Sequence, residues 1–253
     1  MTTLQQNWPL MAIPVLVTIV GGLIAASFTL PPALRSTIQH FTAGVVFAAI
    51  AGEVIPDVID RRVPIATIVG FIIGVALMFG ISRVSDSLVP DAEEEPGTQP
   101  RGNLSVQAAR FPAPLVTAVS IDGLVDGLVI GIGFTVGSTL GTLVTVALSL
   151  EMFFLGLSAA ATLRQSGSPP RLAVMVTTAA ALMIAIGAFL GVTVLGGLSN
   201  AGLAGTLAFG CAALLYLVTE ELLHEAHTVP ETRLMSSLFF AGFLTLLAVE
   251  MSI

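Results

Sequence analysis

The segment Asp122–Phe134 reads DGLVDGLVIGIGF, with two aspartates, Asp122 and Asp126, in an otherwise apolar and glycine-rich run. Their spacing of four residues places both carboxylates on one face of a helix. A charged residue at the middle of a bilayer costs about 2.5–3.5 kcal/mol on insertion scales, and two on one face repel each other. No basic residue stands at the same depth in any apolar run. The pair therefore predicts a bound cation or protons inside a membrane. The alternative is a protonated pair that only holds helices together.

The rest of the chain has the composition of a membrane protein. Its 253 residues are 55% hydrophobic and 10% charged, whereas soluble domains carry about 25% charged residues. A spanning helix needs about 20 mostly apolar residues, and the chain contains eight such runs. We expect a single all-α transmembrane domain over residues 1–253, with helices at about 8–30, 40–59, 65–83, 113–135, 139–163, 172–195, 201–223 and 233–252.

The composition also argues against several classes of function. The net charge of −7 and the absence of a basic patch argue against a nucleic-acid partner. The single Cys211 offers neither a disulfide nor a thiolate metal cluster. The sequence contains no phosphate-binding loop and no nucleophile–base set, so we expect neither an enzyme nor ATP-driven transport. No cofactor is expected beyond a transported metal ion.

The arginines indicate the orientation of the helices. With eight helices both termini lie on one side, and the loops on the other side hold seven of the nine arginines. An excess of basic residues marks the cytoplasmic side. Both termini are therefore expected outside a plasma or inner membrane. The 84–112 loop, which contains DAEEEPG at 91–97, is expected to be flexible and cytoplasmic.

A faint internal repeat relates the second and seventh helices. Phe41 and Glu53 in the second helix have the same spacing as Phe209 and Glu221 in the seventh. Because the two helices run in opposite directions, the pattern is typical of inverted-repeat transporters. It predicts an inverted 3+2+3 arrangement, in which two three-helix halves move against the fourth and fifth helices.

A third acid, Glu151, lies in the fifth helix at the depth of the aspartate pair. We expect Asp122, Asp126 and Glu151 to bind one metal ion. The neighbouring glycines are expected to allow close helix contact, and also local unwinding that would expose carbonyl ligands. His40 is expected only to cap the second helix. Weaker candidates for the ion pathway stand beside the site or near helix ends, where a packing or solvated role is an open alternative: Met152, Glu53, Glu220, Glu221, His224 and His227.

These features resemble the ZIP (Zrt/Irt-like) family of divalent metal transporters over nearly the whole chain. Residues 122–134 are similar to the family's helix-4 motif, His-Asn-x-Pro-Glu-Gly with a Gly-rich tail. LEMFFLGL at 150–157 stands at its second motif, x-x-x-Pro-Glu-Gly, and YLVTEELLHE at 216–225 is similar to its helix-7 ending. The resemblance implies the ZIP fold, with outside termini and a long cytoplasmic loop between helices 3 and 4.

Several positions depart from the family pattern. Asp122 stands at the family's ligand His and Asp126 at its ligand Glu, while Val125 replaces the kinking Pro. Leu155 replaces a Glu that bridges two metals in the family, and the position of a further helix-6 Glu is apolar here, near Ile184. The resemblance therefore implies a divergent member with one metal site, the second having been lost.

We expect a ZIP-like transporter that moves a divalent cation of the Zn, Mn, Fe or Mg class toward the cytoplasm by alternating access. An all-carboxylate site suits Mg²⁺ or Mn²⁺ better than a histidine-bearing site does. Two alternatives are open: a proton or Na⁺ site coupled to another solute, and a non-transporting metal sensor or partner subunit. The expected partners are the ion and the lipid bilayer, with a homodimer as the alternative to a monomer.

Overall fold

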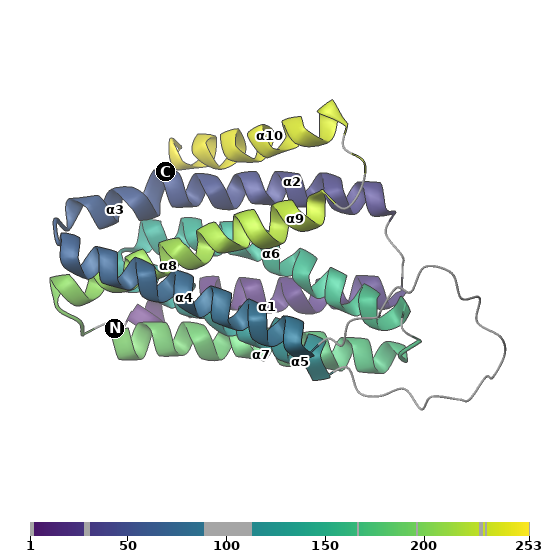
Figure 1. Ribbon diagram of the computed structural model, residues 1–253. Helices are drawn as coiled ribbons and strands as arrows, with labels where there is room; N and C mark the ends of the chain where they lie inside the picture. Colours follow the sequence, from purple (N-terminus) through teal and green to yellow (C-terminus); the bar gives the residue numbers. More distant parts are fainter. Residues whose placement is uncertain are drawn as a thin grey trace.

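The computed structural model describes residues 3–27, 31–88, 113–165, 167–195, 197–227, 230 and 232–252. Eight helices in these residues are long and apolar enough to cross a membrane, which confirms the predicted all-α membrane fold. They lie side by side along one axis, with both termini at one end, the terminal end (Figure 1). The opposite end, where α4 ends and α5 begins, is called the α4–α5 end.

The elements are α1 (Thr3–Ser27), α2 (Pro32–Ala49), η1 (Ile50–Val54), α3 (Ile55–Asp60), α4 (Pro64–Leu88), α5 (Ala113–Val136), α6 (Ser138–Gln165), α7 (Pro170–Leu195), α8 (Asn200–Tyr216), η2 (Leu217–Leu222), α9 (Leu223–Ala226) and α10 (Arg233–Glu250). Here η marks a π-helical turn.

Two of the spanning helices contain a π-helical segment. One is built from α2, η1 and α3 and the other from α8, η2 and α9. Glu53 lies in η1 and Glu221 in η2, so the two glutamates of the internal repeat occupy corresponding backbone features. A π-turn inserts an extra residue and redirects the side chains around it, and such turns are frequent at functional sites.

The helix that begins with α2 starts earlier than the sequence predicted. It begins at Pro32 rather than near residue 40, because Pro31 is the N-cap and Pro32 stands in the first turn. Proline is well suited to that position, since its fixed φ matches the helix and it has no amide hydrogen to leave unpaired. His40 therefore lies inside α2 and does not cap it.

Two further boundaries also differ from expectation. α1 begins at Thr3 rather than near Trp8, and α4 continues to Leu88, so residues 84–88 are helical and not part of a loop. The remainder of the expected flexible loop, 89–112, lies outside the described residues.

The helices pack as two groups of four: α1, α5, α6 and α7 in one, and α2, α4, α8 and α10 in the other. Within a group, glycines allow backbones to approach closely. A Cβ added to Gly127 of α5 would lie under 3.0 Å from the α7 backbone, and one added to Gly44 of α2 would lie equally close to α10. Between the groups, a Cβ on Gly210 of α8 would lie 3.5 Å from Val129 of α5, an ordinary contact.

The packing groups the helices differently from their 3+2+3 order along the chain. The fourth and fifth spanning helices, α5 and α6, pack firmly against α7 and α1 and do not form a separate central pair. The pairing still obeys the inverted repeat. In the repeat, the first three spanning helices correspond in order to the last three, and the fourth corresponds to the fifth. The α1–α6 pair therefore corresponds to the α7–α5 pair, and the α2–α10 pair to the α8–α4 pair.

The acid-bearing helices lie at the centre of the bundle. The apolar windows of α5 and α6 are 61% and 72% buried, whereas those of α4 and α10 are each 17% buried. The side chains of α5 and α6 are therefore shielded from the surface that lipid would cover.

Candidate metal centre

The structure brings the three predicted acids together. α5 carries Asp122 and Asp126 one turn apart, and α6 carries Glu151. One carboxylate oxygen from each side chain lies within 4.8 Å of the other two. Asp126 and Glu151 are only 4% and 3% exposed, and Asp122 is partly buried. These three acids are called the carboxylate centre below.

The carboxylate centre is not neutralised by the protein around it. Asp122 Oδ2, Asp126 Oδ2 and Glu151 Oε2 are buried and have no hydrogen-bond partner within the described part of the chain. Two carboxylates 4.8 Å apart repel by roughly 3–4 kcal/mol at an effective dielectric constant of about 20. Since buried polar atoms nearly always have partners, the arrangement indicates a site for a cation or for shared protons.

The glycines of α5 fulfil one of their two predicted roles, close helix contact, and not the other, local unwinding. α5 is one uninterrupted α-helix from Ala113 to Val136, so the expected local unwinding does not occur. Gly123 and Gly127 instead face α7, where an added Cβ would meet backbone atoms or the Ile184 side chain. Close packing on this side sets the rotation of α5, and the two aspartates project from the neighbouring face.

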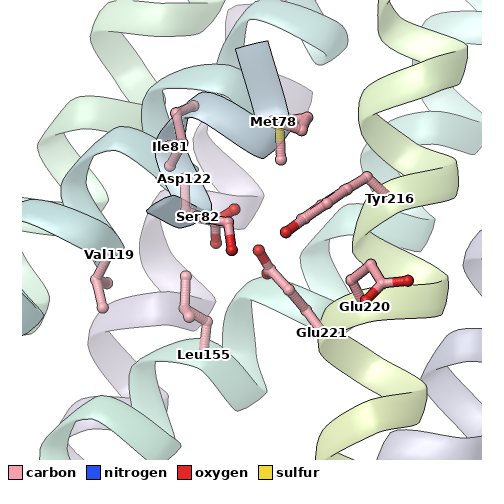
Figure 2. Close-up of a pocket in the computed structure, with 9 residues that line it drawn as sticks. All are labelled: Met78, Ile81, Ser82, Val119, Asp122, Leu155, Tyr216, Glu220 and Glu221. Carbon is pink, nitrogen blue, oxygen red and sulfur yellow. The ribbon is translucent and has the colours of Figure 1, made fainter. Parts of the chain in front are cut away.

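A cavity of about 260 Å³ borders Asp122. It is lined from α4, α5, α6, α8 and η2, by Met78, Ile81, Ser82, Val119, Asp122, Leu155, Tyr216, Glu220 and Glu221. Figure 2 shows the carboxylates of Asp122 and Glu221 pointing toward one another, with the Tyr216 hydroxyl directed into the same space. Because Glu220 is exposed, the cavity leads from the carboxylate centre to the surface near the α4–α5 end.

The opposite side of the carboxylate centre is closed. A space of only about 10 Å³ lies there, lined by apolar residues and glycines from η1, α5, α6 and α8 such as Val54, Val129 and Val144. That volume is at the lower limit for one water molecule. The terminal end of the bundle is therefore separated from the three acids by a layer of buried apolar side chains.

The weaker candidates separate into three kinds. Glu221 lies close enough to the three acids to interact with them electrostatically, while Glu220 lines the cavity but points away from Asp122 (Figure 2). Met152 is fully buried and belongs to the apolar core. Its position is that of a packing residue.

The remaining candidates lie outside the carboxylate centre. Glu53 is near the terminal end, where its acidic neighbours are Asp57 and Glu250, and Asp57 is paired with Arg61 at 2.9 Å. His224 and His227 are exposed at the α4–α5 end. The structure does not bring any of these groups to the three acids.

The positions expected to carry a second metal in related proteins are apolar here. Leu155 lines the cavity beside Asp122. Ile184 is fully buried, and its side chain faces Gly123 of α5. Neither side chain offers a metal ligand.

The family is decided by a comparison that covers the acid-bearing helices. A family model described as ZIP zinc transporter matches residues 93–250, more than half of the chain. The chain belongs to the ZIP zinc transporter family. The matched region contains α5 to α10 and so includes all three acids of the carboxylate centre. This ZIP protein is thus a multi-pass membrane protein of a metal-transporter family, not an enzyme. Comparison with curated proteins gave no match.

Sequence reasoning missed the lining of the cavity. Ser82 and Tyr216 were not identified, and Glu221 was treated as equivalent to Glu220. The only signal for Tyr216 was its place five residues before Glu221 in the helix-7 stretch that resembles the family. The direction of Glu221 depends on the π-turn of η2, which has no sequence signature of its own.

Proposed function

We propose that this ZIP protein carries one divalent metal cation at a time on Asp122, Asp126 and Glu151 and moves it toward the cytoplasm by alternating access. The observation that carries the proposal is the set of three buried carboxylate oxygens within 4.8 Å, with no hydrogen-bonded counter-group among the described residues. A divalent cation offsets their mutual repulsion, and water completes its coordination shell.

The direction of transport rests on two features. The cavity joins the carboxylate centre to the α4–α5 end, whereas an apolar layer closes the terminal end. Seven of the nine arginines belong to the α4–α5 side of the predicted topology, which is therefore assigned to the cytoplasm. In this assignment the structure corresponds to an inward-facing state, from which an ion leaves past Glu221.

The two packing groups supply the moving parts of the mechanism. All three acids belong to the α1, α5, α6 and α7 group, whereas Glu221 lies on η2 of the other group. Glycines bring helix backbones together within the groups, at α5–α7, α1–α6, α2–α10 and α4–α8, whereas Gly210 of α8 makes only an ordinary contact with Val129 of α5 in the other group. A shift of one group past the other would carry the ion and change the end to which it is accessible.

The ligand set bears on which ion is carried. Carboxylate oxygens are hard ligands that suit Mn²⁺ and Mg²⁺, and imidazole would favour zinc. The Irving–Williams order still makes zinc bind a generic site more tightly than manganese. Both Zn²⁺ and Mn²⁺ are therefore proposed as cargo, with less discrimination against Mn²⁺ than a histidine-bearing site would show.

Metal uptake by the purified protein in liposomes tests this proposal. The wild type should accumulate Mn²⁺ or Zn²⁺, and a variant with Asp122→Asn, Asp126→Asn and Glu151→Gln should not. Asp60→Asn, at the exposed end of α3, is the matched control and should transport normally. Uptake by the triple variant at the wild-type rate would contradict the proposal. Metal binding without uptake by the wild type would instead identify a sensor, and metal-independent uptake of another solute driven by Na⁺ or protons would identify a coupled carrier.

A further inference from the structure

Two histidines meet at the α4–α5 end, away from the three acids. His40 is in α2 and His227 directly follows α9, and their ring centroids are 5.3 Å apart with an angle of 80° between the ring planes. The two residues are far apart in the sequence, so the fold brings them together. Neither belongs to the carboxylate centre or its cavity.

The His40 ring is held in one orientation. The side chain is only 2% exposed, and its Nδ1 lies 2.9 Å from the backbone carbonyl oxygen of Ser36, one turn earlier in α2. That carbonyl can only accept, so Nδ1 carries the proton and Nε2 carries the lone pair. Histidines that bind metals commonly donate their other ring N–H to a carbonyl in this way.

His227 is placed by a second set of contacts. Its backbone N–H donates to the Leu223 carbonyl oxygen at 3.0 Å and so completes the last turn of α9. Ser36 Oγ donates to the Ala226 carbonyl oxygen at 2.7 Å, which ties the end of α9 to α2. The His227 side chain itself is exposed, so ions in solution have access to it.

We propose that His40 and His227 form a second metal-binding site, for a borderline transition-metal ion such as Zn²⁺, where α2 meets the end of α9. Two imidazoles bound to one tetrahedral zinc, with Zn–N bonds of roughly 2.1 Å, have ring centroids about 5 Å apart. The observed 5.3 Å matches that separation. Since χ2 of histidine is a broad torsion, a modest rotation can turn a nitrogen of the exposed ring toward His40 Nε2.

The two imidazoles would bind a softer ion than the one the carboxylate centre selects. Imidazole is a common ligand for zinc, copper and nickel, whereas Mn²⁺ and Mg²⁺ prefer oxygen. Ser36 lies one turn before His40 on the same face of α2, and its Oγ is 4.0 Å from the Met235 sulfur. Water supplies the other ligands. The site does not depend on the transport proposal, because it uses none of the transport residues.

Zinc binding to protein that lacks the carboxylate centre tests the site. The background is the Asp122→Asn, Asp126→Asn, Glu151→Gln variant, purified without a polyhistidine tag, and Zn²⁺ per chain is measured by equilibrium dialysis and metal analysis. One equivalent should remain in this background. Adding His227→Ala should remove it. Adding His224→Ala, which changes another exposed histidine only three residues away, should leave it in place.

Each outcome bears directly on the proposal. Loss with His227→Ala and retention with His224→Ala would support the paired site, because His227 is exposed and its removal should leave the fold intact. Absence of zinc from the acid-free background would mean that the two rings only pack against each other. Zinc retained after His227→Ala, or lost equally with His224→Ala, would also overturn the proposal. In the supporting case, pulsed electron paramagnetic resonance of bound Cu²⁺ should report two coordinated imidazoles.

Discussion

Replacing one acid of the carboxylate centre should stabilise the metal-free protein. The three acids form three close pairs, and Asp126 belongs to two of them. Asp126→Asn keeps the shape of the side chain but removes the charge repulsion in those two pairs. With oxygens no more than 4.8 Å apart, each fully ionised pair costs roughly 3.5 kcal/mol at an effective dielectric constant of about 20. Two fully ionised pairs together cost about 7 kcal/mol. Proton uptake by the metal-free wild type lowers the realised cost to a few kcal/mol.

Thermal unfolding in detergent measures this effect. At this chain length, 1 kcal/mol corresponds to roughly 2–4 °C in Tm, so Asp126→Asn should unfold several degrees above the wild type in chelator. Saturating Mn²⁺ should raise the Tm of the wild type, because a ligand at a hundred times its Kd contributes about 2.7 kcal/mol, and should not raise that of Asp126→Asn. Asp60→Asn should follow the wild type. A lower Tm for Asp126→Asn in chelator would refute the reasoning, since it would show that the carboxylate is stabilised by its surroundings.

Three further predictions address the packing, the ligand chemistry and the sidedness of the site. Gly127→Ala should weaken Mn²⁺ binding at least tenfold in equilibrium dialysis, because the added Cβ would collide with the α7 backbone. Gly80→Ala, where the added Cβ would meet open space, should bind Mn²⁺ normally. Equal Mn²⁺ binding by the two variants would refute the role given to this close packing. Asp122→His should raise the ratio of zinc to manganese affinity in competition titrations, and an unchanged ratio would count against a ligand role for this position. A cysteine at Thr3 should react with an impermeant thiol reagent outside intact cells and one at Thr98 should not, whereas the reverse result would invert the topology.

The number of helices was predictable because the bilayer imposes a minimum length on each apolar run. The start of α2 was not, because a proline pair both ends one segment and begins the next: Pro31 serves as the N-cap and Pro32 opens the helix. The grouping of helices also escaped prediction. It depends on which backbones glycines such as Gly127 and Gly44 contact, and the sequence shows only that small residues are present.

The core of the candidate site was predictable for a related reason. Helical periodicity places Asp122 and Asp126 on one face, and counting along α6 places Glu151 at the same depth. Periodicity cannot distinguish Glu220 from Glu221, because the π-turn of η2 changes the direction of both side chains. Nor can it pair His40 with a histidine at the other end of the chain.

The central claim, that three carboxylates hold one transported ion, is tested most directly by Mn²⁺ stoichiometry. Manganese is the appropriate probe because it favours the oxygen ligands of the carboxylate centre over imidazole. Equilibrium dialysis should find one Mn²⁺ per wild-type chain and none in the Asp122→Asn, Asp126→Asn, Glu151→Gln variant. Two Mn²⁺ per wild-type chain, or one in the triple variant, would contradict the account.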